Sequence, residues 1–505
     1  MSQPATIAPS RGKPERGHAA GTGALAGLAS LPALIAASLL LLTWYSSIDR
    51  LNDPDMWWHL RLGVDIWNAG TLPRNDTYSF TTNKHPWVPH EWLAELTIHG
   101  AYAAGGYSGL MLWLITAGGA ASIGLYALCA ISSGNSKTAL AGGLIAWYFS
   151  TVTIAVRPLM LGNVYLAALL LILWLGRERD SRWLWALPPL FAVWVNCHGS
   201  FALGLLIVAV HAAVSHLNLD WGLIESRPWE PNRRKVLLAA AAASAAALFV
   251  NPIGWRLAFY PLDLLANQST NLEHVYEWRP LDFHDPRGMM LFAICSWIVL
   301  MLLIRRQKIH LSELCMLGLG SYLALKHMRM LPIFGLLAAP IVCRLIRRDW
   351  EGYNPAIDPR RVNAAIMAGL FAVMAWRFPT DDGLGSQVNS ANPAAAVAYL
   401  RDNNLTERVL NEYDWGGYIL WAAPEIKTFV DGRADIFDWS GVLHDYTGFA
   451  KLALDPLAIL EKYNVKTCLL AKDSPAAHAL AYLPGWRKAY ADEQAAIFTR
   501  VSPTR

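Results

Sequence analysis

Long apolar runs dominate this chain and restrict it to folds that a membrane can hold. An apolar run of roughly 17 to 25 residues can cross a bilayer as a helix. Only 16% of the 505 residues are charged, against roughly 25% in ordinary soluble domains. We therefore predict an α-helical polytopic membrane protein with about 11 transmembrane helices. The predicted spans are residues 24–46, 108–131, 139–156, 159–175, 183–196, 201–217, 236–250, 289–304, 309–325, 330–346 and 362–377.

The short loops between these spans predict the orientation, because Lys and Arg collect on the cytoplasmic side of a membrane. With a cytoplasmic N-terminus, the basic loop residues all fall inside. These are Lys137 and the basic residues of 177–182, 233–235, 305–308 and 344–361. An odd number of spans then places the C-terminal residues outside, and the predicted location is the inner (cytoplasmic) membrane.

The predicted domain organisation follows from this topology. We expect a disordered cytoplasmic N-terminus over 1–23, a transmembrane domain over 24–377 with outer loops 47–107 and 251–288, and an extracytoplasmic α/β domain over 378–505. In this C-terminal domain, the sequence pattern predicts a helix over 394–404 and strands over 409–410 and 427–431. Residues 92–106 can be an interfacial helix or a further span, and the sequence leaves both open.

Two broad classes of function are disfavoured. The net charge of +4 is spread over many loops without a basic patch, which argues against nucleic-acid binding. The six cysteines form no CxxC pair, so they predict neither a zinc framework nor a disulfide framework.

A cluster of charged and aromatic residues follows the first span. Asp53-Pro54-Asp55-Met56-Trp57-Trp58-His59-Leu60-Arg61 brings two carboxylates, an imidazole and a guanidinium to a membrane boundary, where charged groups are costly. A purely structural interpretation of Trp57 and Trp58 is that they belong to an aromatic belt at the membrane interface. Under the predicted topology, most other unusual polar residues also fall on the outer face, which predicts an outward-facing polar cavity.

Several of these outer residues suit a phosphate-bearing ligand, because Arg and Lys supply charge-assisted donors to phosphate oxygens. Each has a structural alternative: Arg157 can cap a helix or reach headgroups, and His198 can bond a neighbouring helix. For Lys326 and Arg329 ligand binding is the better interpretation. The predicted donor-phosphate residues are Arg61, Arg157, His198, Lys326 and Arg329.

The order of these motifs resembles membrane glycosyltransferases of the C-type (GT-C) superfamily, and distantly the catalytic subunit of oligosaccharyltransferases. Asn52-Asp53-Pro54 with Trp57 is similar to the family's first-loop motif. Arg157 to Asn163 stands where the family has an acidic second-loop motif, but offers an asparagine there. Lys326 to Pro332 resembles the stretch that contacts donor phosphates. Two further segments, 194–199 and 429–435, are typical of uncharacterised bacterial membrane proteins of this kind.

The resemblance implies roles for further residues. Ser269 to Trp278 is similar to a flexible fifth-loop motif, which implies an acceptor role for Glu273 or Glu277. Tyr413 to Tyr418 resembles an acceptor motif that begins with two tryptophans, but that pair is absent here, so recognition of asparagine sequons is not implied. Asp414 and Trp415 are acceptor candidates, with an ordinary tight turn as the alternative.

These residues predict transfer of a sugar from a polyprenyl-phosphate-linked or polyprenyl-diphosphate-linked donor to a protein, lipid or glycan acceptor. Asp53 is the predicted base or metal ligand, with Asp55 and Glu91 as accessory catalytic residues. Mg²⁺ or Mn²⁺ on Asp53 and Asp55 is an option, and a monophosphate donor can need none. Two alternatives remain: a transporter or flippase for a lipid-linked saccharide, and a non-catalytic envelope assembly protein.

Overall fold

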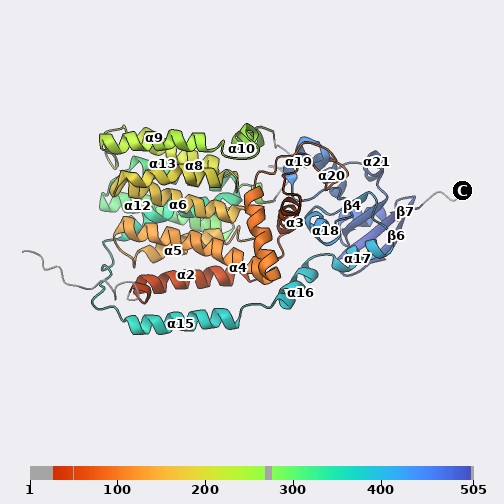
Figure 1. Cartoon of the computed structure of the whole chain (residues 1–505), viewed down its shortest axis with the longest axis horizontal. Coiled ribbons are helices and arrows are strands. Elements are labelled where there is room, and N and C mark those ends of the chain that lie inside the picture. Colours follow the sequence, from red (N-terminus) through yellow and green to blue (C-terminus); the bar gives the residue numbers. More distant parts are fainter. Residues whose placement is uncertain (1–26, 49, 268–275, 502–505) are drawn as a thin grey trace, which may run out of the picture.

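The chain forms a long helical bundle with a smaller α/β region at one end (Figure 1). The computed structural model describes residues 27–48, 50–267 and 276–501. The predicted disordered segment 1–23 and the candidate acceptor residue Glu273 lie outside the described residues.

The bundle helices lie where the apolar runs predicted them. In the bundle, α14 packs against α5 and α13, and α4 packs against α2 and α6. The bundle helices are α2 (Leu31–Ser47), α4 (Trp92–Ser133), α5 (Ala139–Ser150), α6 (Leu159–Glu178), α7 (Leu187–Trp194) with the preceding 3₁₀ turn η1 (Ser181–Ala186), α8 (Phe201–Val214), α9 (Pro231–Ala247), α12 (Pro286–Arg305), α13 (Leu311–Lys326), α14 (Leu331–Ile346) with the preceding 3₁₀ turn η3 (Met328–Met330), and α15 (Arg360–Trp376).

Four helices among the described residues are long and apolar enough to cross a membrane. They are α4, α6, α12 and α14 extended by η3. A fifth span is possible if α15 and α16 (Asp381–Ala391), which meet at 59°, act as one. Others, such as α5 with 12 residues, are shorter than a typical span. The structure therefore supports a polytopic membrane protein, and eleven spans remain a prediction.

Small elements join the helices at the two ends of the bundle. A three-stranded sheet pairs β1 (Leu219–Trp221) with β2 (Ile224–Ser226) and β2 with β3 (Ile309–His310). Between α9 and α12 lie α10 (Trp255–Asn267) and the 3₁₀ turn η2 (Tyr276–Trp278).

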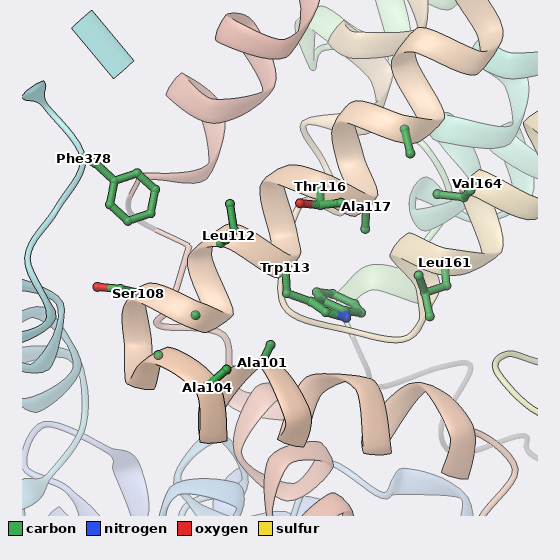
Figure 2. Close-up of a pocket in the computed structure, with 13 residues that line it drawn as sticks. Ala101, Ala104, Ser108, Leu112, Trp113, Thr116, Ala117, Leu161, Val164 and Phe378 are labelled. Atoms are coloured by element: carbon green, nitrogen blue, oxygen red, sulfur yellow. The ribbon is translucent and has the colours of Figure 1, made fainter. Parts of the chain in front are cut away.

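The segment 92–106 is the first limb of α4, and it ends at a sharp break. Gly105 and Gly106 leave the helical conformation, and Gly106 has a positive φ of 57°, which favours glycine. Figure 2 shows the two limbs of α4 meeting at this bend. The first limb packs on α3 (Pro54–Ala69) so closely that a Cβ on Gly63 would lie 2.4 Å from the backbone oxygen of Glu95.

The C-terminal region contains a four-stranded sheet with the order β4-β5-β7-β6. β4 and β5 are parallel, and the other two pairings are antiparallel. Its elements are α17 (Ala394–Asp402), β4 (Val409–Asn411), η4 (Tyr413–Trp415), α18 (Gly416–Ala422), α19 (Ala434–Trp439), α20 (Val442–Ala450), α21 (Pro456–Lys462), β5 (Thr467–Ala471), α22 (Pro475–Leu480), β6 (Trp486–Ala491) and β7 (Ala495–Arg500).

One predicted strand in this region is wrong. Residues 427–431 make a single bridge, between Thr428 and Ser79, and otherwise run as an irregular loop. An apolar run of this length reads as a strand, but here Phe429 and Val430 are buried because the loop crosses the core beneath residues 76–82.

The C-terminal region shares its core with α3 and does not hang from the bundle as a separate body. The Trp57 ring meets Tyr418 of α18 edge to face, with 5.4 Å between centroids. Trp58 and Leu62 pack in one buried cluster with Phe429 and Phe437. This packing brings the start of α3 against residues that follow it by more than 350 positions.

Candidate active site

The start of α3 presents the two predicted carboxylates. Asp53 is the N-cap: its carboxylate accepts the backbone N–H of Asp55 at 3.0 Å, and Pro54 occupies the first helical position. Aspartate at the N-cap and proline after it are favoured there, because proline has no N–H to lose and its φ is already helical. Local sequence therefore places Asp53 and Asp55 together at the positive end of a helix dipole.

Arg157, between α5 and α6, is the hub that binds these carboxylates. Its Nε donates to Asp53 Oδ1 at 2.7 Å, and its Nη1 lies 3.2 Å from Asp55 Oδ2. The same Nη1 lies 3.0 Å from both oxygens of Glu277. One guanidinium thus joins three carboxylates from two separate segments, the start of α3 and η2, and its side chain is only 15% exposed.

Arg329 adds a second guanidinium beside Glu277. Its Nη1 lies 3.9 Å from Glu277 Oε2, and its guanidinium stacks on the Trp278 ring at 4.4 Å. His327 Nδ1 bonds the carbonyl oxygen of Trp278 at 2.7 Å, which holds η2 against η3. Arg329 makes one long ion pair among the described residues, so its N–H groups are less committed than those of Arg157.

The electrostatics of this group divide its acids into two kinds. Burial raises the pKa of Asp55 from an ordinary 3.8 to about 7, against the charge of Arg157 and aided by Asp53 and Glu277. Burial also acts on Glu277, but Arg157 and Arg329 outweigh it and lower its pKa below 4.5. At neutral pH Glu277 is ionised and Asp55 can exchange a proton, which is what a general base requires.

The backbone of the C-terminal region lies against the carboxylate of Asp55. A Cβ built on Gly432 would lie 1.9 Å from Asp55 Oδ1 and 2.8 Å from Trp58 Nε1. The indole N–H of Trp58 donates to the same Asp55 oxygen at 3.3 Å. Gly432 therefore lets the backbone of the loop 427–433 approach the carboxylate, and a larger residue there would displace Asp55.

A second group of acids and imidazoles adjoins the first. His59 Nδ1 lies 3.1 Å from Glu95 Oε1 and 3.9 Å from Glu91 Oε2. His198 Nε2 lies 3.5 Å from Glu91 Oε1. Burial raises the pKa of Glu91, against the charges of His90 and Arg329 and aided by Asp55.

His198 is neutral, so it differs from the phosphate-binding cation predicted from the sequence. Burial lowers its pKa to about 3, with Arg329 and His90 acting in the same direction. The backbone N–H of Ser200 donates to His198 Nδ1 at 3.1 Å, so the proton of the neutral ring sits on Nε2. His198 can still donate one hydrogen bond, but it brings no positive charge.

The structure separates two predicted cations from this group. Arg61 pairs with Asp65 on the same helix at 2.9 Å, and Asp65 also accepts the hydroxyl of Tyr78. Lys326 is exposed, with its Nζ 5.9 Å from the centroid of the Tyr322 ring. Neither contacts Asp53, Asp55 or Glu277 within the described part of the chain.

The acceptor candidates lie at different distances from the hub. Glu277 belongs to it through Arg157. Asp414 of η4 is exposed and lies within electrostatic range of Asp53 and Arg157. Trp415 is half-buried and packs into the core that α3 shares with the C-terminal region. The turn around Asp414 therefore faces the group around Arg157, while Trp415 contributes packing.

The sequence offered Asp431, Arg433 and Asp435 as acceptor contacts, with tight-turn chemistry as the favoured alternative, and it missed the role of Glu95. Glu95 was noted only as part of an apolar helix, yet it is buried against His59. Asp435 accepts the hydroxyl of Tyr260 at 2.6 Å, and burial raises its pKa to about 6. Arg433 pairs with Asp431 and Asp76 in the core. A tight turn accounts for the Arg433 backbone N–H that donates to Asp431 Oδ1, but not for the pair with Asp76.

The residues Asp53 and Asp55 do not fit the predicted Mg²⁺ or Mn²⁺. Both carboxylates already pair with the Arg157 guanidinium, whose positive charge would repel a divalent ion bound between them. Among the described residues, the side chains whose ligand atoms converge on one point are instead His59, Glu91 and Glu95.

An apolar cavity of about 600 Å³ opens beside the bend in α4. Gly105, Gly109 and Trp113 of α4 line it, together with Leu161 of α6 and Phe378. Figure 2 shows Trp113 and Leu161 facing each other across it. Leu161, in the first turn of α6, follows Arg157 by four residues in the chain.

Comparison with known proteins identifies the fold. No protein-family model matches the chain, and no curated protein matches it. Among solved structures it resembles the archaeal oligosaccharyltransferase AglB from Archaeoglobus fulgidus in complex with an inhibitory peptide and a dolichol-phosphate (TM-score 0.52, 12% identity, 86% of this chain and 69% of that chain). The form of that enzyme tethered to an acceptor peptide with the NVT sequon gives a TM-score of 0.55 at 12% identity over the same shares.

A third similar structure is ArnT from Cupriavidus metallidurans bound to undecaprenyl phosphate, with a TM-score of 0.53 and 14% identity. The match covers 93% of this chain and 98% of that one. The expected distant similarity to GT-C membrane glycosyltransferases is confirmed, and at these identities it concerns the fold.

Proposed function

We propose that this chain is an integral-membrane glycosyltransferase that moves a sugar from a polyprenyl-phosphate-linked donor to an acceptor at the outer face of the cytoplasmic membrane. The observation that carries the proposal is the group Asp53, Asp55, Arg157, Glu277 and Arg329, which joins a carboxylate of pKa about 7 to two guanidinium groups. Sugar transfer needs both, because the acceptor loses a proton while the departing phosphate gains charge.

Each residue of the group receives a role in this proposal. Asp55 is the general base for the acceptor. Arg329 donates to the donor phosphate, because its N–H groups are the less committed of the two arginines. Arg157 organises the acids, and Asp53 fixes both Arg157 and the start of α3. Asp55 thus takes the role that the sequence had suggested for Asp53.

The apolar cavity supports a lipid-linked donor. Its volume of about 600 Å³ lies in the range of ligand pockets, roughly 300–1,000 Å³, and its lining is almost entirely apolar. A polyprenyl chain lying there would carry its phosphate toward Arg157 and Arg329. The similar solved structures hold dolichol-phosphate in AglB and undecaprenyl phosphate in ArnT, which supports the same class of donor here.

The test uses the purified chain with polyprenyl-phosphate and polyprenyl-diphosphate sugars, and follows release or transfer of radiolabelled sugar. Asp55→Asn should lower kcat by about 10²- to 10⁴-fold, the usual contribution of a general base. Arg329→Ala should lower kcat/KM by about 10- to 150-fold, since it removes charge-assisted hydrogen bonds worth about 1.5–3 kcal/mol. Lys326→Ala is the matched control, because Lys326 forms no ion pair with the group among the described residues, and it should keep near-normal turnover.

The cavity has its own test. Val164→Trp fills it from α6, so KM should rise for long-chain donors and stay unchanged for donors with short lipid chains. An equal effect on both chain lengths would remove the cavity from the proposal. Tight donor binding without turnover in the wild type would favour the transporter or the assembly protein.

The metal requirement is tested in the same assay. Because Arg157 already pairs with Asp53 and Asp55, turnover should persist when Mg²⁺ and Mn²⁺ are omitted. Turnover that depends on adding either ion would restore the metal prediction made from the sequence.

A further inference from the structure

The buried group of His59, Glu91 and Glu95 has the geometry of a metal site. One ligand atom from each residue lies within 4.8 Å of the others, and all three residues are buried. His59 Nδ1 lies 3.1 Å from Glu95 Oε1 and 3.9 Å from Glu91 Oε2. A tetrahedral zinc ion with bonds of about 2.0–2.2 Å keeps neighbouring ligand atoms about 3.4 Å apart. The observed separations lie on either side of that value.

The charges of this group are not balanced by protein cations. Neither Glu91 nor Glu95 forms an ion pair with a Lys or Arg within the described ranges; their ion-pair partners are histidines. Glu95 is 1% exposed, and its Oε2 has no hydrogen-bond partner. An unpaired buried carboxylate oxygen carries a desolvation cost, so a native structure needs a reason for it.

Two further histidines, His90 and His198, lie beside the carboxylate of Glu91. His90 Nε2 lies 3.7 Å from Glu91 Oε2, and its Nδ1 lies 3.4 Å from the carbonyl oxygen of Val88. His198 bonds the other oxygen of Glu91 and helps to orient it.

We propose that His59, Glu91 and Glu95 bind a divalent transition-metal ion of the zinc class, with water or His90 in the fourth position. Imidazole and carboxylate ligands in a small tetrahedral set suit zinc, whereas Mg²⁺ prefers octahedral oxygen ligands and retained water. The site is separate from Asp53 and Asp55. It would join α3 to the first limb of α4 and so hold Asp55 in place, whatever reaction the chain performs.

The test measures metal directly and needs no activity. The full chain is purified in detergent, stripped with a chelator, and loaded with Zn²⁺, Co²⁺ or Mg²⁺. We expect one Zn²⁺ per chain by elemental analysis, a higher Tm with Zn²⁺ than with Mg²⁺, and visible Co²⁺ absorption typical of four coordination. Glu95→Gln keeps the side-chain shape but removes a ligand, so it should weaken Zn²⁺ binding by more than about tenfold.

The controls separate this site from its neighbours. Asp53→Asn should keep full Zn²⁺ and Co²⁺ binding, because Asp53 is not a ligand. His59→Asn is a second ligand variant in case one of the two fails to fold. Wild-type protein that binds neither Zn²⁺ nor Co²⁺ overturns the proposal, and so does Glu95→Gln that binds them as tightly as wild type. Zinc binding without any glycosyl transfer would leave this site standing and refute only the proposed function.

Discussion

Replacing Gly432 with alanine tests whether the position of Asp55 decides activity. The new methyl group would lie 1.9 Å from Asp55 Oδ1, and real Cβ contacts are essentially never shorter than 3.0 Å. The carboxylate therefore has to move by about 1 Å or more, and a displacement of this size at a reacting group costs on the order of 100-fold in rate. The backbone conformation of Gly432 does not exclude alanine, since its φ is not positive.

We expect Gly432→Ala to lower kcat by about 100-fold and to leave the fold intact. The side chain of Asp55 is 24% exposed and can swing away from the methyl group. The buried Trp58, whose Nε1 would lie 2.8 Å from the methyl group, needs to shift by only a few tenths of an ångström. Turnover of the lipid-linked donor and Tm by thermal unfolding in detergent measure the two effects. Gly432→Ala moves the carboxylate of Asp55 and not the guanidinium groups proposed to face the donor. The KM for the donor should therefore change much less than kcat.

Gly352→Ala is the matched control, because Gly352 has open space around its added Cβ. It should behave as wild type in both measurements. The reasoning fails if Gly432→Ala keeps kcat within about twofold of wild type while Asp55→Asn abolishes it. It fails equally if Gly432→Ala unfolds the chain, because the structure predicts that Asp55 yields.

Three further predictions concern pH and the buried ion pairs. Activity should rise with pH through about 7 as Asp55 loses its proton, and a pH–rate profile without that rise would remove Asp55 as base. Arg157→Ala leaves Asp53 and Asp55 without an ion pair and Glu277 with Arg329 alone, and it should cost about 3–5 kcal/mol of unfolding free energy. Since Arg157 lowers the pKa of Glu277, the loss should be full above pH 4.5 and shrink below it, whereas the exposed Arg182→Ala should change little. Arg433→Ala should also cost about 3–5 kcal/mol of unfolding free energy, because it breaks the ion pair with Asp76, in which the Arg433 side chain is 1% exposed. Denaturant unfolding measures this cost, and a value under about 1 kcal/mol would contradict the argument.

Local sequence determined the elements of this protein. Apolar runs predicted the positions of the bundle helices, because a run of such residues is stable in lipid or in a core as a helix that satisfies its own backbone. The helix α3 was not predicted, because residues 47–107 were assigned to an outer loop, although Asp53-Pro54 is a local N-cap signal that places two carboxylates at its first turn. The wrong strand at 427–431 marks the limit: a short apolar run fits a buried loop as well as a strand.

Tertiary structure alone decided which of these groups act together. Arg157 reaches Asp53 across 104 positions of the chain and Glu277 across 120, and Arg433 reaches Asp76 across 357. The sequence contained Lys326 and Arg329 three residues apart, yet η3 turns Arg329 toward Glu277 and leaves Lys326 exposed. The raised pKa of Asp55 likewise has no local signal, because it arises when the loop 427–433 closes over α3. Hydropathy and capping are properties of neighbours in sequence, whereas charge pairing and burial depend on which distant segments the fold brings into contact.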